Sequence, residues 1–130
     1  MKLDKKILLS TLWIFAVLNY LYADVLGFYK PGMIQEILTG SVEGLTFTPV
    51  FLLIGAILME TAIVMVLLSR ILKYRWNRIT NITAGIIHTL AVSASLFVGT
   101  PAPYYVFFGT IEIITTLFII RIAWKWKEVK

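Results

Sequence analysis

Four long apolar stretches constrain this chain more than any other feature. They cover residues 7–28, 48–72, 77–99 and 103–124, which is most of the 130 residues. A helix needs about 20 mostly apolar residues to cross the hydrocarbon core of a membrane. Backbone polar groups in the hydrocarbon must be satisfied within the protein, which favours helices here because the alternating segments of a β-barrel do not occur. The sequence therefore predicts an all-α membrane four-helix bundle, a single transmembrane domain over residues 1–130.

The composition supports the same class of protein. The chain is 59% hydrophobic and 15% charged, whereas a soluble domain averages about 45–50% apolar and about 25% charged residues. A soluble globule of this size could not bury so much apolar surface under so few charged side chains. The lack of cysteine excludes disulfide frameworks, thiolate metal sites and thiol redox chemistry.

The basic residues predict the orientation. With an even number of crossings, every lysine and arginine except Lys30 falls on one side, and basic residues favour the cytoplasmic side. Both termini are therefore expected in the cytoplasm, and we interpret the net charge of +5 as a topology signal, not as nucleic-acid binding. The residues on the predicted inner side are Lys2, Lys5, Lys6, Arg70, Lys73, Arg75, Arg78, Arg121, Lys125, Lys127 and Lys130.

Turn and capping residues set the expected limits of the spans. Thr48 followed by Pro49 is typical of a helix start, with a hydroxyl cap before a ring suited to the first turn. Residues 99–103 contain a glycine and two prolines and should separate the last two spans. The basic segment 70–78 is expected to be a short loop. The first span is longer than the 7–15 apolar residues of a signal peptide, so we expect it to be retained.

Residues 29–47 form the one sizeable connection outside the predicted spans. Its residues 31–38 could form a short helix on the outer surface, which Gly40 would end. We favour an amphipathic connector for this segment. The alternative is a lid over a cavity.

Each predicted span carries a polar side chain near its centre: Asn19, Glu60, His88 and Glu112. Ionisable groups in a membrane nearly always face the protein interior or a cavity. Small residues at helical spacing flank His88 and Glu112, which is typical of close helix contacts. These observations predict a central ligand or proton site built from the four side chains, with Tyr20 and Asp24 on another face of the first span, closer to an outer mouth.

Two carboxyl groups in a low-dielectric interior are not expected to be charged together. We therefore expect one ion pair between a glutamate and His88, with the second glutamate protonated. Such a cluster could hold a proton, a cation or the amine of a ligand. The alternative is a purely structural role, in which the same side chains only hydrogen-bond across helices.

Three classes of function remain open at this stage. The first is a multi-pass protein that binds or transports a small, cationic or hydrogen-bonding ligand. The second is an intramembrane enzyme that uses Glu60, His88 and Glu112 for acid–base chemistry on a lipid-soluble substrate. The third is a structural or accessory subunit. No catalytic residue or cofactor is assigned. A metal site is not assigned either, because the Glu-x-x-His pairs of di-iron bundles do not occur. The expected partners are the lipid bilayer and a small ligand. The oligomeric state is not predicted.

Six segments of the chain carry a family signature. They read STLWIF (10–15), LNYLYAD (18–24), ILME (57–60), IHT (87–89), GTP (99–101) and YYVFFGTIE (104–112). Together they resemble an uncharacterised family of short bacterial four-span membrane proteins, a domain of unknown function. The resemblance implies a four-helix fold in a bacterial cytoplasmic (inner) membrane and no activity. The layout is also similar to DoxX-like families, in which a glutamate on the second span recurs. Glu60 corresponds to it here, without an assigned role.

Overall fold

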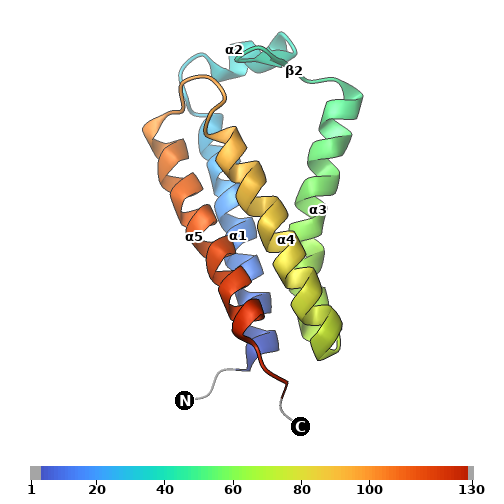
Figure 1. The fold of residues 1–130 in the computed structure, drawn as a ribbon. Coiled ribbons are helices and arrows are strands. Elements are labelled where there is room, and N and C mark those ends of the chain that lie inside the picture. Colours follow the sequence, from blue (N-terminus) through green and yellow to red (C-terminus); the bar gives the residue numbers. More distant parts are fainter. Residues whose placement is uncertain (1–3, 129–130) are drawn as a thin grey trace.

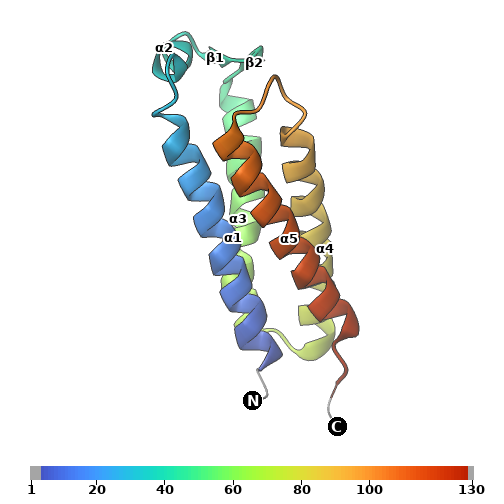
Figure 2. The same ribbon diagram turned by 90° about the vertical axis from the view of Figure 1, so that its left-hand side faces the viewer.

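The computed structural model describes residues 4–128. The described residues form four long helices, one short helix and a small hairpin. The long helices lie side by side, and the short helix and the hairpin lie across one end of them (Figures 1 and 2). We call this cap, residues 29–47, the roof. The elements are α1 (Lys5–Gly27), α2 (Met33–Leu38), β1 (Ser41–Val42), β2 (Leu45–Thr46), α3 (Pro49–Ile71), α4 (Tyr74–Ser95) and α5 (Pro103–Lys125).

Three of the long helices, α1, α3 and α5, are long and apolar enough to cross a membrane. The helix α4 is of similar length but carries more polar side chains, among them Asn77, Asn81 and His88, which are all buried. These polar residues lower the hydropathy of α4, although their side chains are buried in the protein and not exposed at its surface. The structure thus supports helices that can span a membrane, and the fourth crossing stays a prediction.

The predicted start of the second long helix, α3, is confirmed. The Thr48 hydroxyl accepts a hydrogen bond from the Phe51 backbone N–H at 3.0 Å, and α3 begins at Pro49. In the roof, α2 lies inside the expected surface helix. The hairpin that follows α2 was not predicted from the sequence. Strands β1 and β2 pair antiparallel through a turn in which Glu43 and Gly44 both have positive φ, at 48° and 82°. Positive φ at both central residues is the geometry of a tight hairpin turn.

The expected loop over 70–78 is wrong. Only residues 72–73 separate α3 from α4, and helical hydrogen bonds continue on both sides, from Leu72 N–H to the Leu68 carbonyl and from Asn77 N–H to the Lys73 carbonyl. Basic side chains can extend away from a helix end, so the backbone does not need to leave the helical conformation. Arg78, near the start of α4, links this helix to α5. Its guanidinium donates hydrogen bonds to carbonyl oxygens at the end of α5, those of Ala123 and Trp124, both at 2.9 Å.

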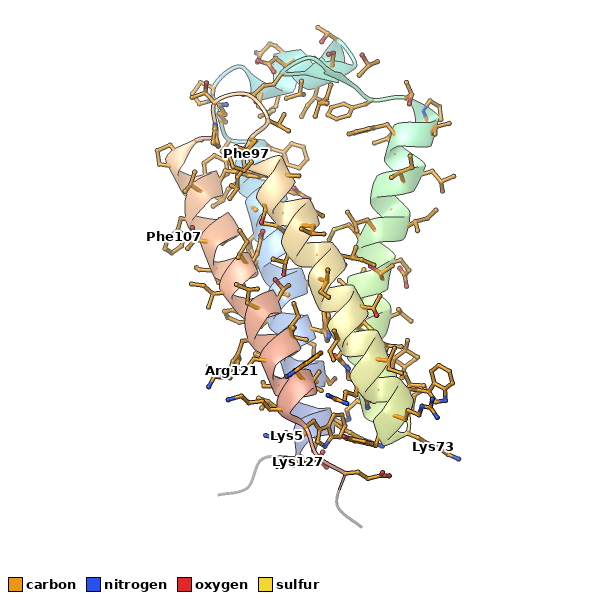
Figure 3. The ribbon with its side chains drawn as sticks, viewed as in Figure 1. Lys5, Lys73, Phe97, Phe107, Arg121 and Lys127 are labelled. Atoms are coloured by element: carbon orange, nitrogen blue, oxygen red, sulfur yellow. The ribbon has the colours of Figure 1, made fainter. Side chains whose placement is uncertain are left out.

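Basic side chains gather at the end opposite the roof, which we call the basic end. Lys5, Lys73, Arg121 and Lys127 lie there in Figure 3. Lys30 belongs to the roof, where its ammonium lies 3.7 Å from the Glu43 carboxylate. The charge asymmetry expected from the sequence is therefore present. Lys2 and Lys130, which belonged to that expectation, fall outside the described residues.

A buried polar layer closes the half of the molecule nearest the basic end. Trp13 Nε1 donates to Asn81 Oδ1 at 2.8 Å, and Ser69 Oγ donates to the same oxygen at 3.3 Å. Asn81 Nδ2 in turn donates to Asn77 Oδ1 at 2.7 Å, and Asn77 Nδ2 donates to the Ser69 carbonyl. All four side chains are fully buried. This polar layer ties α1, α3 and α4 together.

The half nearest the roof is open by comparison, because α3 leans away from α4 there (Figure 1). The buried residues of α3 are Ala62, Met65 and Ser69, all in its second half. Residues 50–57 in its first half are exposed. A cavity can therefore form between the roof and the polar layer.

Candidate functional site

An outer cavity of about 840 Å³ lies beneath the roof. Its lining comes from the roof, α1, the start of α3, the end of α4, and the segment that leads into α5. Most of this lining is apolar, and the volume lies in the range of pockets that hold drug-sized ligands. The apolar residues that the roof turns toward the cavity are Met33, Ile37, Val42, Leu45 and Phe47.

A smaller inner cavity of about 160 Å³ continues toward the middle of the molecule. Asp24, Ser95 and Tyr105 line both cavities, so the two adjoin at these residues. The inner cavity contains the polar cluster of the molecule. Its polar lining residues are Tyr20, Asp24, His88, Ser95, Tyr105 and Glu112.

Three side chains hold the ring of His88, which is only 2% exposed. Tyr20 stacks on it at 5.6 Å between ring centroids, and Trp13 meets its edge at 5.5 Å. His88 Nε2 lies 2.8 Å from Thr61 Oγ1, while the hydroxyl hydrogen of Thr61 is directed to the Leu58 carbonyl. Thr61 must therefore accept from Nε2–H. This fixes the tautomer of a neutral ring and leaves Nδ1 as a hydrogen-bond acceptor.

Two buried polar atoms at the inner cavity have no hydrogen-bond partner among the described residues: the Tyr20 hydroxyl and Glu112 Oε1. Tyr20 is 7% exposed and Glu112 is 5% exposed. Nearly all buried polar side-chain atoms in proteins are hydrogen-bonded, so two orphan atoms in one cavity indicate a site for a further polar group.

A second carboxyl group, that of Asp24, lies at the junction of the two cavities. Asp24 and Glu112 both line the inner cavity. The site thus offers two carboxyl groups, a phenol and an imidazole nitrogen. Most of these groups accept hydrogen bonds, so the arrangement suits a ligand that donates several and carries a positive charge.

No metal centre is indicated in the part of the chain that the structure describes. There, no group of three or more His, Cys, Asp and Glu side chains is placed to hold a metal ion.

A family model matches the chain over residues 1–130, and its description is a family of unknown function, DUF6326. The chain belongs to the DUF6326 family. No curated protein and no solved structure matches it. The resemblance to an uncharacterised family that was expected from the sequence is confirmed. The similarity to DoxX-like families is not shown by these comparisons.

The structure brings together only part of the site predicted for this DUF6326 member. His88 and Glu112 line the inner cavity, and so do Tyr20 and Asp24. Tyr20 and Asp24 were expected on another face of the first span, closer to an outer mouth. In the structure Tyr20 stacks directly on His88, and of these two residues it is Asp24 that also lines the outer cavity. The i,i+4 spacing of Tyr20 and Asp24 therefore places both side chains on the inner cavity.

Glu60 and Asn19 line neither cavity, so the expectation that all four central side chains face one interior is wrong for them. Glu60 is exposed. It is two residues from the buried Ala62, and two residues correspond to about 200° around a helix, so Glu60 lies on the opposite face of α3. Asn19 is half-buried, and its Nδ2 donates to the Phe15 carbonyl of its own helix.

The expected ion pair between His88 and a glutamate is also wrong, since the described salt bridge is Lys30–Glu43 and the ring bonds Thr61 instead. Sequence reasoning missed Thr61, because a threonine can satisfy its hydroxyl within its own helix and gives no distinct signal. It also missed Tyr105 and Ser95. Both lie next to the predicted break at 99–103, and that position could have marked them as residues at a cavity mouth.

Proposed function

We propose that this DUF6326 member is a four-span protein of a bacterial cytoplasmic membrane with the basic end in the cytoplasm. The α4 helix supports a fourth crossing because its 22 residues lie beside the three apolar helices, and 22 residues of helix extend about 33 Å. Three of its polar side chains, Asn77, Asn81 and His88, are buried within the protein, so they would not contact lipid. The charge asymmetry between the basic end and the roof supports the orientation.

We propose further that the chain binds a small cationic ligand, an amine, at Tyr20, Asp24, His88 and Glu112. One observation carries this proposal: Glu112 Oε1 and the Tyr20 hydroxyl are buried at one cavity without partners among the described residues. A buried polar group without a hydrogen bond costs about 1–3 kcal/mol. An ammonium group has three N–H donors and a positive charge that complements an ionised carboxylate, so it would offset this cost.

The polar layer separates the inner cavity from the basic end of the molecule. Trp13, Asn77 and Asn81 fill the space between the inner cavity and the basic end, and their hydrogen bonds are satisfied. A transport cycle would need this layer to open. Binding needs no such change, and we therefore propose binding as the primary function.

An acid–base reaction is the second candidate, and one observation favours it. His88 and Glu112 line the same cavity, and the Thr61 contact leaves His88 Nδ1 free to accept a proton. A lipid-soluble substrate with an acidic C–H or O–H could be held between the two groups. Product formation by the purified protein would distinguish this candidate from binding alone.

Thermal unfolding of the purified protein in lipid nanodiscs tests the proposal. The probes are three molecules of one shape: cyclohexylamine, cyclohexanol and cyclohexanecarboxylate. We expect the amine to raise the melting temperature by several degrees and the carboxylate to leave it unchanged, because only a cation complements two carboxyl groups.

Glu112→Gln and Glu60→Gln form a matched pair for this experiment, since the same chemical change is made in a cavity and on an exposed helix face. The shift caused by cyclohexylamine should be largely lost in E112Q and kept in E60Q. An equal shift in both variants, or no shift with the wild type, would overturn the proposal.

A further inference from the structure

The roof closes the outer cavity on the side away from the membrane. Its apolar residues, such as Met33, Ile37 and Leu45, line the cavity. The hairpin is also fixed to its surroundings at the Glu43 turn. The Glu43 carboxylate lies 3.7 Å from Lys30, and it packs so closely on Gly99 that a Cβ at that position would overlap it. The Glu43 turn thus contacts both the first residues of the roof and the connection between α4 and α5.

The side of the cavity next to α3 is built differently. From the first half of α3 only Leu52 lines the outer cavity, together with Phe47 just before the helix. Residues 50–57 are exposed, and α3 diverges from α4 toward the roof (Figure 1). In a membrane this side faces the hydrocarbon of the outer leaflet. The lateral wall beside α3 is therefore the weakest part of the enclosure.

The carboxyl group of Asp24 lies at a depth that suits a ligand entering from the side of α3. Asp24 lies three residues before the end of α1 at Gly27, which is about 4.5 Å along the helix axis. A head group bound at Asp24 would sit near the outer interface of the bilayer. An attached hydrocarbon tail could then leave beside α3 into the acyl chains, in the orientation that amphiphiles already have in a membrane.

We propose that the ligand is a single-chain amphiphilic amine that enters sideways from the outer leaflet, past Leu52, with its head group at Asp24 and its tail beside α3. This inference rests on the proposed amine site and adds the class of ligand and its route. Burial of an apolar tail against a mostly apolar cavity wall contributes affinity that a soluble amine lacks.

A series of n-alkylamines from hexylamine to hexadecylamine tests the class of ligand, with melting temperatures measured in nanodiscs. A lateral opening lets long tails extend into lipid, so stabilisation should persist up to hexadecylamine. A closed cavity would reject chains beyond a limiting length. A sharp loss of stabilisation at the longer chains would overturn the inference.

Two substitutions on adjacent residues test the route. Leu52→Trp places a bulky ring at the lateral side of the cavity, whereas Leu53→Trp places it on an exposed position that does not line the cavity. We expect L52W to weaken dodecylamine binding about tenfold and L53W to leave it unchanged. Equal effects of the two variants would contradict lateral entry.

The roof provides the opposing test. The chain has no cysteine, so Glu43→Cys and Gly99→Cys can be joined by a short bis-maleimide in the folded protein. Dodecylamine should still bind to the cross-linked protein. If cross-linking abolishes binding, the ligand enters through the roof and lateral entry is wrong. If cyclohexylamine binds while all the long-chain amines fail, the proposed amine site stands and only the present inference falls.

Discussion

Three side chains from two other helices determine the position and orientation of the His88 ring. Trp13 and Tyr20 from α1 contact its ring, and Thr61 from α3 accepts its Nε2–H. The orientation of the imidazole is thus fixed by contacts within the protein itself. Preorganised polar groups lose less conformational freedom on binding, which favours affinity.

Thr61→Val tests this positioning at the residue scale. Valine keeps the shape of threonine but removes the acceptor of His88, so a buried N–H is left without a partner. We expect the free energy of unfolding to fall by about 1–3 kcal/mol, measured by denaturant titration in detergent. Thr110→Val is the control, because Thr110 is exposed and bonds only its own helix. A similar loss in both variants would contradict a specific role for Thr61.

Close packing of α4 on α5 is the main contact between elements near the site. A Cβ built at Gly85 would lie 2.6 Å from Ile120 Cγ1 and 3.4 Å from the Thr116 carbonyl oxygen. Thr89 and Thr116 also share a hydrogen bond of 2.7 Å across the two helices. Small residues that allow backbones to approach are typical of helix contacts in membranes.

Gly85→Ala and Gly55→Ala should therefore have opposite effects. G85A forces α4 and α5 apart and is expected to cost about 1–3 kcal/mol through overpacking. A methyl group added at Gly55 in α3 would meet no neighbouring atom within 4 Å, so G55A should gain up to about 1 kcal/mol from helix propensity. Unfolding of both variants in the same detergent measures the difference, and equal values would contradict the packing described above.

At the scale of the whole molecule, the roof and the basic end should lie on opposite sides of the membrane. The lack of cysteine allows single-cysteine labelling without a background. A membrane-impermeant maleimide added to intact cells should label Glu36→Cys in α2 and leave Lys127→Cys unlabelled until the cells are opened. Both positions are exposed, so accessibility alone does not distinguish them. The reverse labelling pattern would overturn the proposed orientation.

The sequence by itself determined that the chain forms long apolar helices, where α3 and α5 begin, and which end gathers the basic residues. These features depend on local composition, capping and charge, and neighbouring residues in the chain decide them. It also identified His88 and Glu112 as candidate site residues. Only the tertiary structure decided which polar side chains share a cavity. Glu60 and Thr61 are adjacent in sequence, yet one faces outward and the other bonds His88. In a helix that is apolar all round, the pattern does not fix the rotation about the axis; packing against α1 and α4 does.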